Sequence, residues 1–240
     1  ALGVRLTPAT VSLQAYREIL FAQSVTITAF RNSLFLATSA AVLLVVLSVP
    51  LGLWLVRRRG AIAAVIETAV DIPYALPGIV VALAFILLFA APIPIAGISI
   101  YATIWIILLA YLASFMSVAL KPVAASLTQT DIALEEAASL AGAGYWRRLV
   151  DVVAPLVAPA AGAAAILVFL IAVNELTVSA LLWAAGTQTL GVAVYNLQDS
   201  GAASLASALS VVIVAMVFVL MLALEAVAPR LPKGSIPWRS

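Results

Sequence analysis

The strongest constraint on the fold is a series of long apolar segments separated by short polar ones. Five of these segments are long and apolar enough to cross a hydrocarbon core of about 30 Å as helices of about 20 residues. Backbone polar groups find no water in lipid, so each segment is expected to be helical. We place the spans at residues 33–56, 66–90, 101–120, 156–183 and 204–226. The sequence therefore predicts an all-α, polytopic membrane helical bundle.

Composition excludes several classes of function. The chain is 65% hydrophobic and 9% charged, which is typical of polytopic membrane proteins. It contains neither cysteine nor histidine, so disulfides, thiol nucleophiles, imidazole bases and Cys/His metal sites are excluded. The formal net charge of +2 does not indicate nucleic acid, because topology distributes the basic residues of a membrane protein. We expect no catalytic residues, no bound metal and no nucleic-acid partner.

The distribution of basic residues predicts the orientation. The hairpin 91–100 and the loop 184–203 contain no Lys or Arg. The connections after the first, third and fifth spans carry Arg57, Arg58, Arg59, Lys121, Arg147, Arg148, Arg230, Lys233 and Arg239. By the positive-inside rule these connections face the cytoplasm. The loop 121–155 and the tail 229–240 are therefore expected in the cytoplasm.

An odd number of spans that ends inside must begin outside. We therefore expect residues 1–32 to form an external segment that precedes a membrane domain over 33–228. This segment has no initiator Met and no signal peptide, and Arg5, Arg17 and Arg31 oppose the charge bias. The expectation is a fragment of a larger membrane protein. A native five-span protein with a translocated N-terminus is the alternative.

Helix-breaking residues interrupt one of the predicted spans and follow another. Asp71, Pro73 and Pro77 lie early in the second span, where prolines free backbone carbonyls and bend a helix. Such breaks suit a transport pathway, but they also suit the interfacial start of a helix with Asp71 in contact with water. Pro122 is expected to end the third span.

A polar pair lies inside the predicted fourth span. Asn174 and Glu175 would place a carboxyl in the membrane, where an unpaired charge costs at least about 2.5 kcal/mol. One interpretation is a pathway or gate. The other is a structural hydrogen bond between helices near the outer membrane surface.

The cytoplasmic loop has the local signals of a short, rigid helix. Thr130 or Asp131 can cap a helix that runs to about Leu140. Gly142 can supply the left-handed residue that ends it, and a second helix can begin at Tyr145.

Within that helix we expect Glu135 and Glu136 to be exposed, beside the small residues Ala137 and Ala138. The next span would start at Pro155. A rigid helix across the cytoplasmic surface can transmit a push from another protein, whereas an ordinary amphipathic connector would serve no such purpose.

Glu136-Ala137-Ala138, three residues, Gly142, nine residues and a segment ending in Pro155 resemble the coupling-loop signature of ABC importer permeases. The family has Ile and Leu where this chain has Val152 and Ala154. The resemblance implies that the residues that contact the ATPase are Glu135, Glu136, Ala137, Ala138 and Gly142, and that Pro155 closes the motif.

Nearly the whole chain resembles the second half of the fused permeases of ferric-iron uptake systems, which are related to thiamine, polyamine and phosphonate permeases. The resemblance implies the type I (MetI-like) importer fold with a five-helix core, in the bacterial inner membrane. The implied partners are ABC ATPase subunits that carry ATP and Mg²⁺, a periplasmic solute-binding protein, and a second permease half, fused or separate. No cofactor is expected on this chain.

The resulting hypothesis is a permease subunit of an ATP-driven, binding-protein-dependent importer. The chain has no phosphate-binding Gly-rich loop, so it is not expected to be an enzyme by itself. Ferric iron is the favoured solute, with thiamine, polyamine and phosphonate as competitors, and selectivity is expected in the binding protein. The alternative is a secondary carrier that uses Asp71 and Glu175 for ion coupling and needs no docking helix. An intramembrane hydrolase is disfavoured, since no nucleophile and base are evident at one depth.

Overall fold

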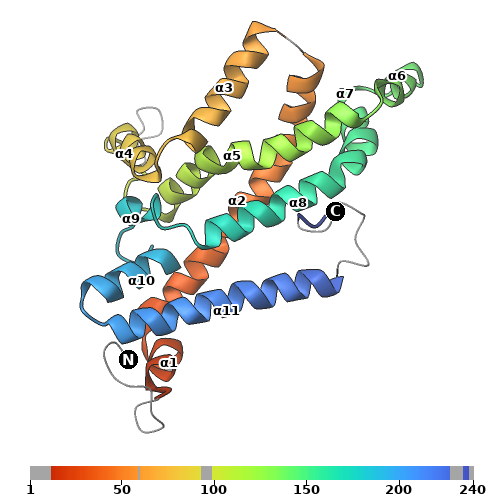
Figure 1. Ribbon diagram of the computed structural model, residues 1–240. Coiled ribbons are helices and arrows are strands. Elements are labelled where there is room, and N and C mark those ends of the chain that lie inside the picture. Colours follow the sequence, from red (N-terminus) through yellow and green to blue (C-terminus); the bar gives the residue numbers. More distant parts are fainter. Residues whose placement is uncertain (1–11, 59, 93–98, 228–234, 238–240) are drawn as a thin grey trace. The chain divides into compact units, whose positions relative to one another are not determined.

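Every regular element of the described chain is a helix. The structure, a computed structural model, describes residues 12–58, 60–92, 99–227 and 235–237 (Figure 1). The longer helices are α2 (Ser24–Arg57), α3 (Ala61–Ala75), α4 (Gly78–Phe89), α5 (Ile104–Gln129), α8 (Ala154–Val173) and α11 (Ala203–Val227). The shorter ones are α1 (Gln14–Arg17), α6 (Ile132–Leu140), α7 (Tyr145–Arg147), α9 (Ser179–Leu182) and α10 (Leu190–Asp199), with π-helical segments η1 (Glu18–Ala22) and η2 (Arg148–Val153). The predicted all-α class is confirmed.

Against the five predicted spans, the described residues contain four or five segments that could cross a membrane. Four segments are long and apolar enough to cross a membrane, namely α2, α5, the continuous run Tyr145–Val173 and most of α11. The pair α3 and α4 makes a fifth if it is taken as one broken span. The break falls at Leu76, whose backbone is extended, and at Pro77. The helix break predicted around Pro73 and Pro77 therefore does interrupt the second span, although Pro73 itself lies inside α3.

Three predicted boundaries are wrong. The helix α2 begins at Ser24, so the expected external segment 1–32 already contains its first turns. Pro122 does not end the third span, because α5 continues to Gln129. Packing overrides the local cost of this proline, since Val123 and Leu127 on the following turns are fully buried. The fourth span ends at Val173 rather than at residue 183.

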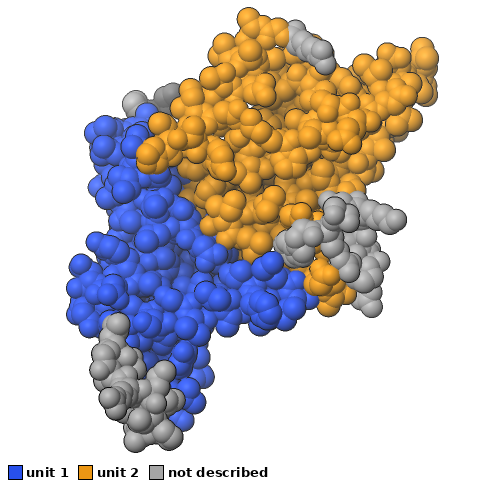
Figure 2. Space-filling model, viewed as in Figure 1, with its two compact units in different colours: residues 1–36, 78–110, 172–223 blue, residues 37–77, 111–171, 224–240 orange. Residues whose placement is uncertain are grey.

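The chain divides into two compact units (Figure 2). One unit comprises Ala1–Leu36, Gly78–Ala110 and Ala172–Ala223, and the other Ala37–Pro77, Tyr111–Ile171 and Leu224–Ser240. Several residues of the topology argument lie outside the described residues, namely Arg5, Arg59, Arg230, Lys233, Arg239, most of the hairpin 91–100 and most of the tail 229–240.

The second unit has an apolar core where helices α2, α5 and α8 meet. Leu53 of α2 packs with Val123 and Leu127 of α5 in one buried cluster. Leu149 and Val153 of η2 and Val157 and Ala161 of α8 complete this cluster. Gly52 lets α2 approach α5, since a Cβ there would lie 3.3 Å from Leu127 Cδ1. This core holds the two helices that flank α6 and α7, namely α5 and α8, against α2.

In the first unit, hydrogen bonds fix the polar loop that precedes α10. The Asn32 side chain of α2 donates to the carbonyl oxygens of Gly186 and Gln188 at 2.9 and 3.0 Å. Ser33 Oγ accepts from the Leu190 N–H at 2.8 Å. The neighbouring α9 also packs against α4 and α10. The loop before α10 is thereby held by two buried polar side chains of α2.

Candidate functional site

The sequence offered Thr130 or Asp131 as the N-cap of α6, and the structure decides between them. Asp131 has an extended backbone, and its Oδ1 accepts from the Ala133 N–H at 2.9 Å. A side-chain oxygen in this position satisfies one of the unpaired amides of the first turn. Thr130 instead donates its hydroxyl to the Ser126 carbonyl at 3.0 Å, within the end of α5. Asp131 is therefore the cap.

The other end of α6 closes in a Schellman motif centred on Gly142. The Ala143 N–H donates to the Ala138 carbonyl, and the Gly142 N–H to the Ser139 carbonyl, both at 2.9 Å. Gly142 has φ of 85°, and no atom lies within 4 Å of the position of a Cβ. Glycine is thus required here by backbone conformation alone. The predicted left-handed stop at Gly142 is confirmed.

Only one side chain of α6 is buried, and it is charged. Glu135 is 9% exposed, whereas Leu134 is 47% and Leu140 91% exposed. Glu136 and Ala137 are also exposed, and Ala138 is half-buried. The expectation that both glutamates face solvent is therefore wrong for Glu135. The reason is an unpredicted partner at the end of α2.

That partner is Arg57. Its Nε and Nη2 both donate to Glu135 Oε1, at 2.8 and 2.6 Å. The side chains of Arg57 and Glu135 retain 23% and 11% exposure. Two charge-assisted hydrogen bonds to one carboxylate oxygen explain why a glutamate tolerates burial here. The helix α6 is therefore attached to α2 by an ion pair rather than by apolar packing.

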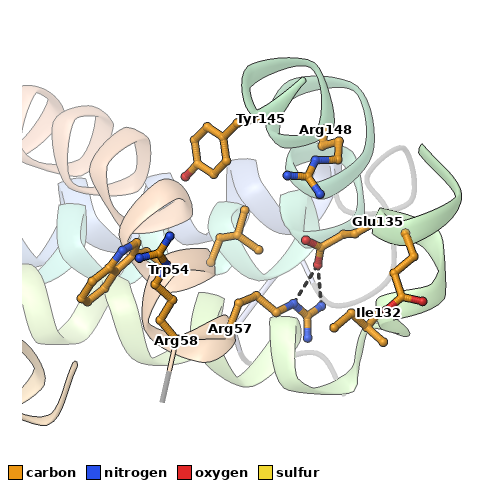
Figure 3. Close-up of a pocket in the computed structure, with 9 residues that line it drawn as sticks. Trp54, Arg57, Arg58, Ile132, Glu135, Tyr145 and Arg148 are labelled. Atoms are coloured by element: carbon orange, nitrogen blue, oxygen red, sulfur yellow. Dashed lines mark hydrogen bonds and ion pairs between the residues drawn. The ribbon is translucent and has the colours of Figure 1, made fainter. Parts of the chain in front are cut away.

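A cavity of about 340 Å³ lies around this ion pair. Figure 3 shows Arg57 and Arg148 on opposite sides of the Glu135 carboxylate, with Tyr145 and Trp54 further along the wall. The cavity is lined by Leu53, Trp54, Arg57, Arg58, Ile132, Glu135, Glu136, Tyr145 and Arg148. Sequence reasoning missed Arg57 and Arg148 as neighbours of Glu135, because no local spacing relates them.

Pro155 follows directly on the π-helical segment η2. It lies in the first turn of α8, which begins at Ala154, so the predicted start of the span is one residue late. Proline has no N–H to donate to the carbonyl four residues earlier, which belongs to Asp151. The wider π turn lies where the regular hydrogen-bond ladder cannot continue.

Asp71 has two partners on α5 in the second unit. Ser117 Oγ donates to its Oδ1 at 2.6 Å, and Lys121 Nζ donates to its Oδ2 at 2.7 Å. Ser117 and Lys121 lie one helical turn apart, so both can reach one carboxylate. The Asp71 and Lys121 side chains are 38% and 59% exposed. Asp71 thus links α3 to α5.

Glu175 does not lie inside a membrane helix. The chain leaves α8 at Val173, and Glu175 Oε1 accepts from Thr177 Oγ1 at 2.7 Å and from the Val178 N–H at 2.6 Å. The carboxylate thereby satisfies an amide just before α9. The prediction of a carboxyl well within the fourth span is wrong, because these bonds stabilise a turn instead. Asn174 is exposed at the start of the same turn.

The turn after Glu175 lies against the first residue of α4. A Cβ on Gly78 would collide with Thr177 Oγ1 and lie 2.9 Å from Thr177 Cβ. Only glycine permits this approach. The first unit therefore brings the start of α4, the second half of the broken span, beside the Glu175 turn, whereas Asp71, Pro73 and Pro77 belong to the second unit.

A sequence profile described as "binding-protein-dependent transport system inner membrane component" matches residues 45–233. Among curated proteins, one named as the 2-aminoethylphosphonate transport system permease PhnV of Salmonella typhimurium is 32% identical over 161 residues, which is 67% of this chain and 59% of that protein. The Fe(3+)-transport system permease FbpB 2 of Haemophilus influenzae is 29% identical over 170 residues, 71% of this chain and 33% of that protein.

The ABC transporter permease y4fN of Sinorhizobium fredii matches 99% of this chain, at 27% identity, and 42% of its own length. The chain thus spans 59% or less of these relatives. Among solved structures, a bacterial alginate ABC transporter in complex with its periplasmic protein gives a TM-score of 0.73 at 18% identity, covering 92% of this chain and 87% of that one. The MetNI methionine ABC transporter gives 0.65 at 23% identity, covering 86% and 96%. These structures share the fold.

Proposed function

Because the chain belongs to the family of binding-protein-dependent transport system inner membrane components, we propose that it forms the membrane pathway of an ATP-driven importer. In this proposal the chain has no nucleotide chemistry of its own. A partner ABC ATPase binds ATP and Mg²⁺, a solute-binding protein delivers the solute from outside, and a second permease half completes the pathway. The protein acts in the bacterial inner membrane, with the end that carries α6 in the cytoplasm.

The exposed surface of α6 is the observation that carries this proposal. A short helix with Ile132 49%, Leu134 47% and Leu140 91% exposed presents apolar side chains that a partner can bury. Both ends are fixed, by the Asp131 cap and by the Gly142 turn. These features support α6 as the docking element for the ATPase.

The two adjacent glutamates have different roles in this proposal. Glu136 is exposed, so it can meet a basic rim on the ATPase. Glu135 faces inward and attaches α6 to Arg57 of α2. Ala137 has no bulk that would keep a partner's groove from the helix backbone. Of the residues first assigned to the ATPase contact, Glu135 is therefore reassigned to positioning.

Movement of α6 has a physical route into the spans. The Arg57–Glu135 pair connects α6 to α2, and the buried cluster around Leu53, Val123 and Val157 connects α2 to α5 and α8. When ATP binding closes the ATPase dimer, displacement of α6 is transmitted through these contacts and opens the pathway outward. Hydrolysis restores the resting arrangement. The coupling therefore depends on one defined set of contacts, whose arrangement is shifted both by the ATPase and by the state of the pathway.

We propose ferric iron or 2-aminoethylphosphonate as the solute, since proteins named for both are similar to this chain. Thiamine and polyamines are weaker candidates. Selectivity is assigned to the binding protein. The Asp71 and Glu175 carboxylates are both engaged by hydrogen bonds within the chain, which favours structural roles over the ion coupling that a secondary carrier requires.

The test is ATP-driven uptake in proteoliposomes that contain the intact permease, its ATPase and its binding protein, with ferric iron and 2-aminoethylphosphonate offered separately. We expect Glu136→Lys and Gly142→Pro to abolish uptake and co-purification of the ATPase, while Glu136→Gln retains part of both. Uptake that persists without ATP and ignores all three changes would support a secondary carrier and refute the proposal.

A further inference from the structure

We propose that the cavity beneath α6 is a binding site for a phosphate group, held by Arg58 and Arg148. The group can belong to an anionic phospholipid headgroup or to a free phosphate. The two arginines that hold the phosphate are not on α6, although Ile132 and Glu136 of α6 border both this cavity and the proposed docking surface. The lipid source rests on the proposed orientation, in which this cavity lies at the cytoplasmic membrane surface.

The charges that line the cavity are not balanced. Arg57 is paired with Glu135. Among the described residues, no carboxylate lies within 4 Å of a nitrogen of Arg58 or Arg148. Glu136 also lines the cavity, so three guanidinium groups face two carboxylates. One positive charge is left for an outside anion.

Arg148 also has an unsatisfied donor. Its Nε is buried and has no hydrogen-bond partner in the described part of the chain. A buried donor without a partner is expensive, and more so when it is charged. In Figure 3 the Arg148 side chain lies on the opposite side of Glu135 from Arg57, whose two donors occupy Oε1. An anion in the cavity would offset the charge of the Arg148 guanidinium, although it would not reach the enclosed Nε itself, without disturbing the Arg57–Glu135 pair.

The shape and walls of the cavity suit a phosphate ester. Its volume of about 340 Å³ lies at the lower end of small-ligand sites. Guanidinium groups match the oxygens of a phosphate with parallel hydrogen bonds. Leu53, Trp54 and Ile132 provide apolar wall on which the glycerol part of a lipid can rest. Basic pockets beside membrane helices on the cytoplasmic side are suited to lipid headgroups.

Occupancy would change the attachment of α6. The bound group would lie next to the Arg57–Glu135 pair, between the end of α2 and the segment Tyr145–Arg148. It would neutralise Arg148 and so lower the competition between two guanidinium groups for Glu135. Anionic lipid is thereby expected to steady α6 and to strengthen its coupling to the spans.

The test uses the intact purified permease in nanodiscs of zwitterionic phosphatidylcholine, with and without anionic phosphatidylglycerol, and measures retained phosphatidylglycerol by native mass spectrometry. Inorganic phosphate added to phosphatidylcholine nanodiscs forms a third arm, read as a shift in thermal unfolding. The variants are Arg148→Gln and Arg58→Gln. Arg147→Gln is the matched control, because Arg147 is exposed, does not line the cavity and has the same charge.

We expect Arg148→Gln and Arg58→Gln each to weaken retention by about tenfold, the effect of losing one charge-assisted contact, and Arg147→Gln to leave it unchanged. Arg58 is exposed, so its variant is not expected to unfold the chain. A shift with inorganic phosphate that the same two variants abolish would identify a free anion as the occupant. Equal losses in all three variants, or no preference for phosphatidylglycerol and no phosphate shift, would overturn the proposal. Neither readout involves ATP, so failure here is separable from failure of the transport proposal.

Discussion

Substitution of Glu135 tests the attachment of α6 most directly. The change Glu135→Gln keeps the shape of the side chain and removes its charge, so the two hydrogen bonds from Arg57 end on a neutral oxygen and the ion pair is lost. No other side chain of α6 is buried, and α6 otherwise contacts η2, so the pair with Arg57 is its link to α2. We expect α6 to detach more often from α2 while the helices around it stay packed.

The magnitude follows from the geometry. Hydrogen bonds to charged groups contribute about 1.5–3 kcal/mol each, and removing one partner of a fully buried pair costs about 3–5 kcal/mol. Arg57 and Glu135 keep 23% and 11% exposure, so water replaces part of the loss. We expect the attachment to weaken by about 2 kcal/mol, which is about a 30-fold increase in the detached population.

Amide hydrogen exchange on the intact permease in nanodiscs measures this population. Protection of the α6 amides is expected to fall about 30-fold in Glu135→Gln, with little change in the buried turns of α5 and α8. The matched control is Glu136→Gln, which removes the same charge from an exposed neighbour. The exchanged pair Arg57→Glu with Glu135→Arg should recover part of the protection. Equal exchange in the two single variants, or no recovery in the exchanged pair, would refute the ion pair as the attachment.

Three further substitutions have defined outcomes. Gly142→Ala should destabilise the end of α6 by about 1–2 kcal/mol because φ is positive there, whereas Gly144→Ala, at φ of −68°, should not, as read by exchange at Ala143 and its neighbours. Gly78→Ala should lower thermal stability by about 1–3 kcal/mol through its collision with Thr177, and Thr177→Ala in the same chain should restore part of it; an unchanged melting temperature would contradict the close contact. Asp71→Asn should change stability by less than about 1 kcal/mol, since the pair with Lys121 is exposed. Uptake by this variant should still depend on ATP. If the native chain takes up solute in a proton-dependent way and Asp71→Asn removes that dependence, a carrier is favoured instead.

Local signals in the sequence predicted the loop well. Asp131 and Gly142 act on their own neighbours within a few residues, so the cap and the stop of α6 could be derived without knowledge of the fold. The long apolar segments likewise specified helices, because lipid allows few alternatives.

Errors arose where tertiary contacts override local preference. Pro122 lies inside α5 because the residues after it are buried in the core of the second unit. The partner of Glu135 lies 78 residues away on α2, a separation that no spacing rule reveals. Glu175 satisfies its carboxylate within its own turn, whereas the hydropathy of its surroundings suggested a continuous span. For Pro122 and Glu135 the deciding contact is remote in the sequence, whereas for Glu175 it lies two and three residues away and was masked by the apolar residues around it.

The π-helical segment η2 gives the fourth membrane-length run a point of low bending stiffness. Pro155 and Pro159 each lack an N–H, so the carbonyls of Asp151 and Pro155 lose their regular partners within one turn of η2. A helix bends most readily where its hydrogen-bond ladder is already interrupted. A force applied at α6 and α7 would therefore bend the chain at η2. The helix α8 beyond η2 can then tilt as a rigid rod.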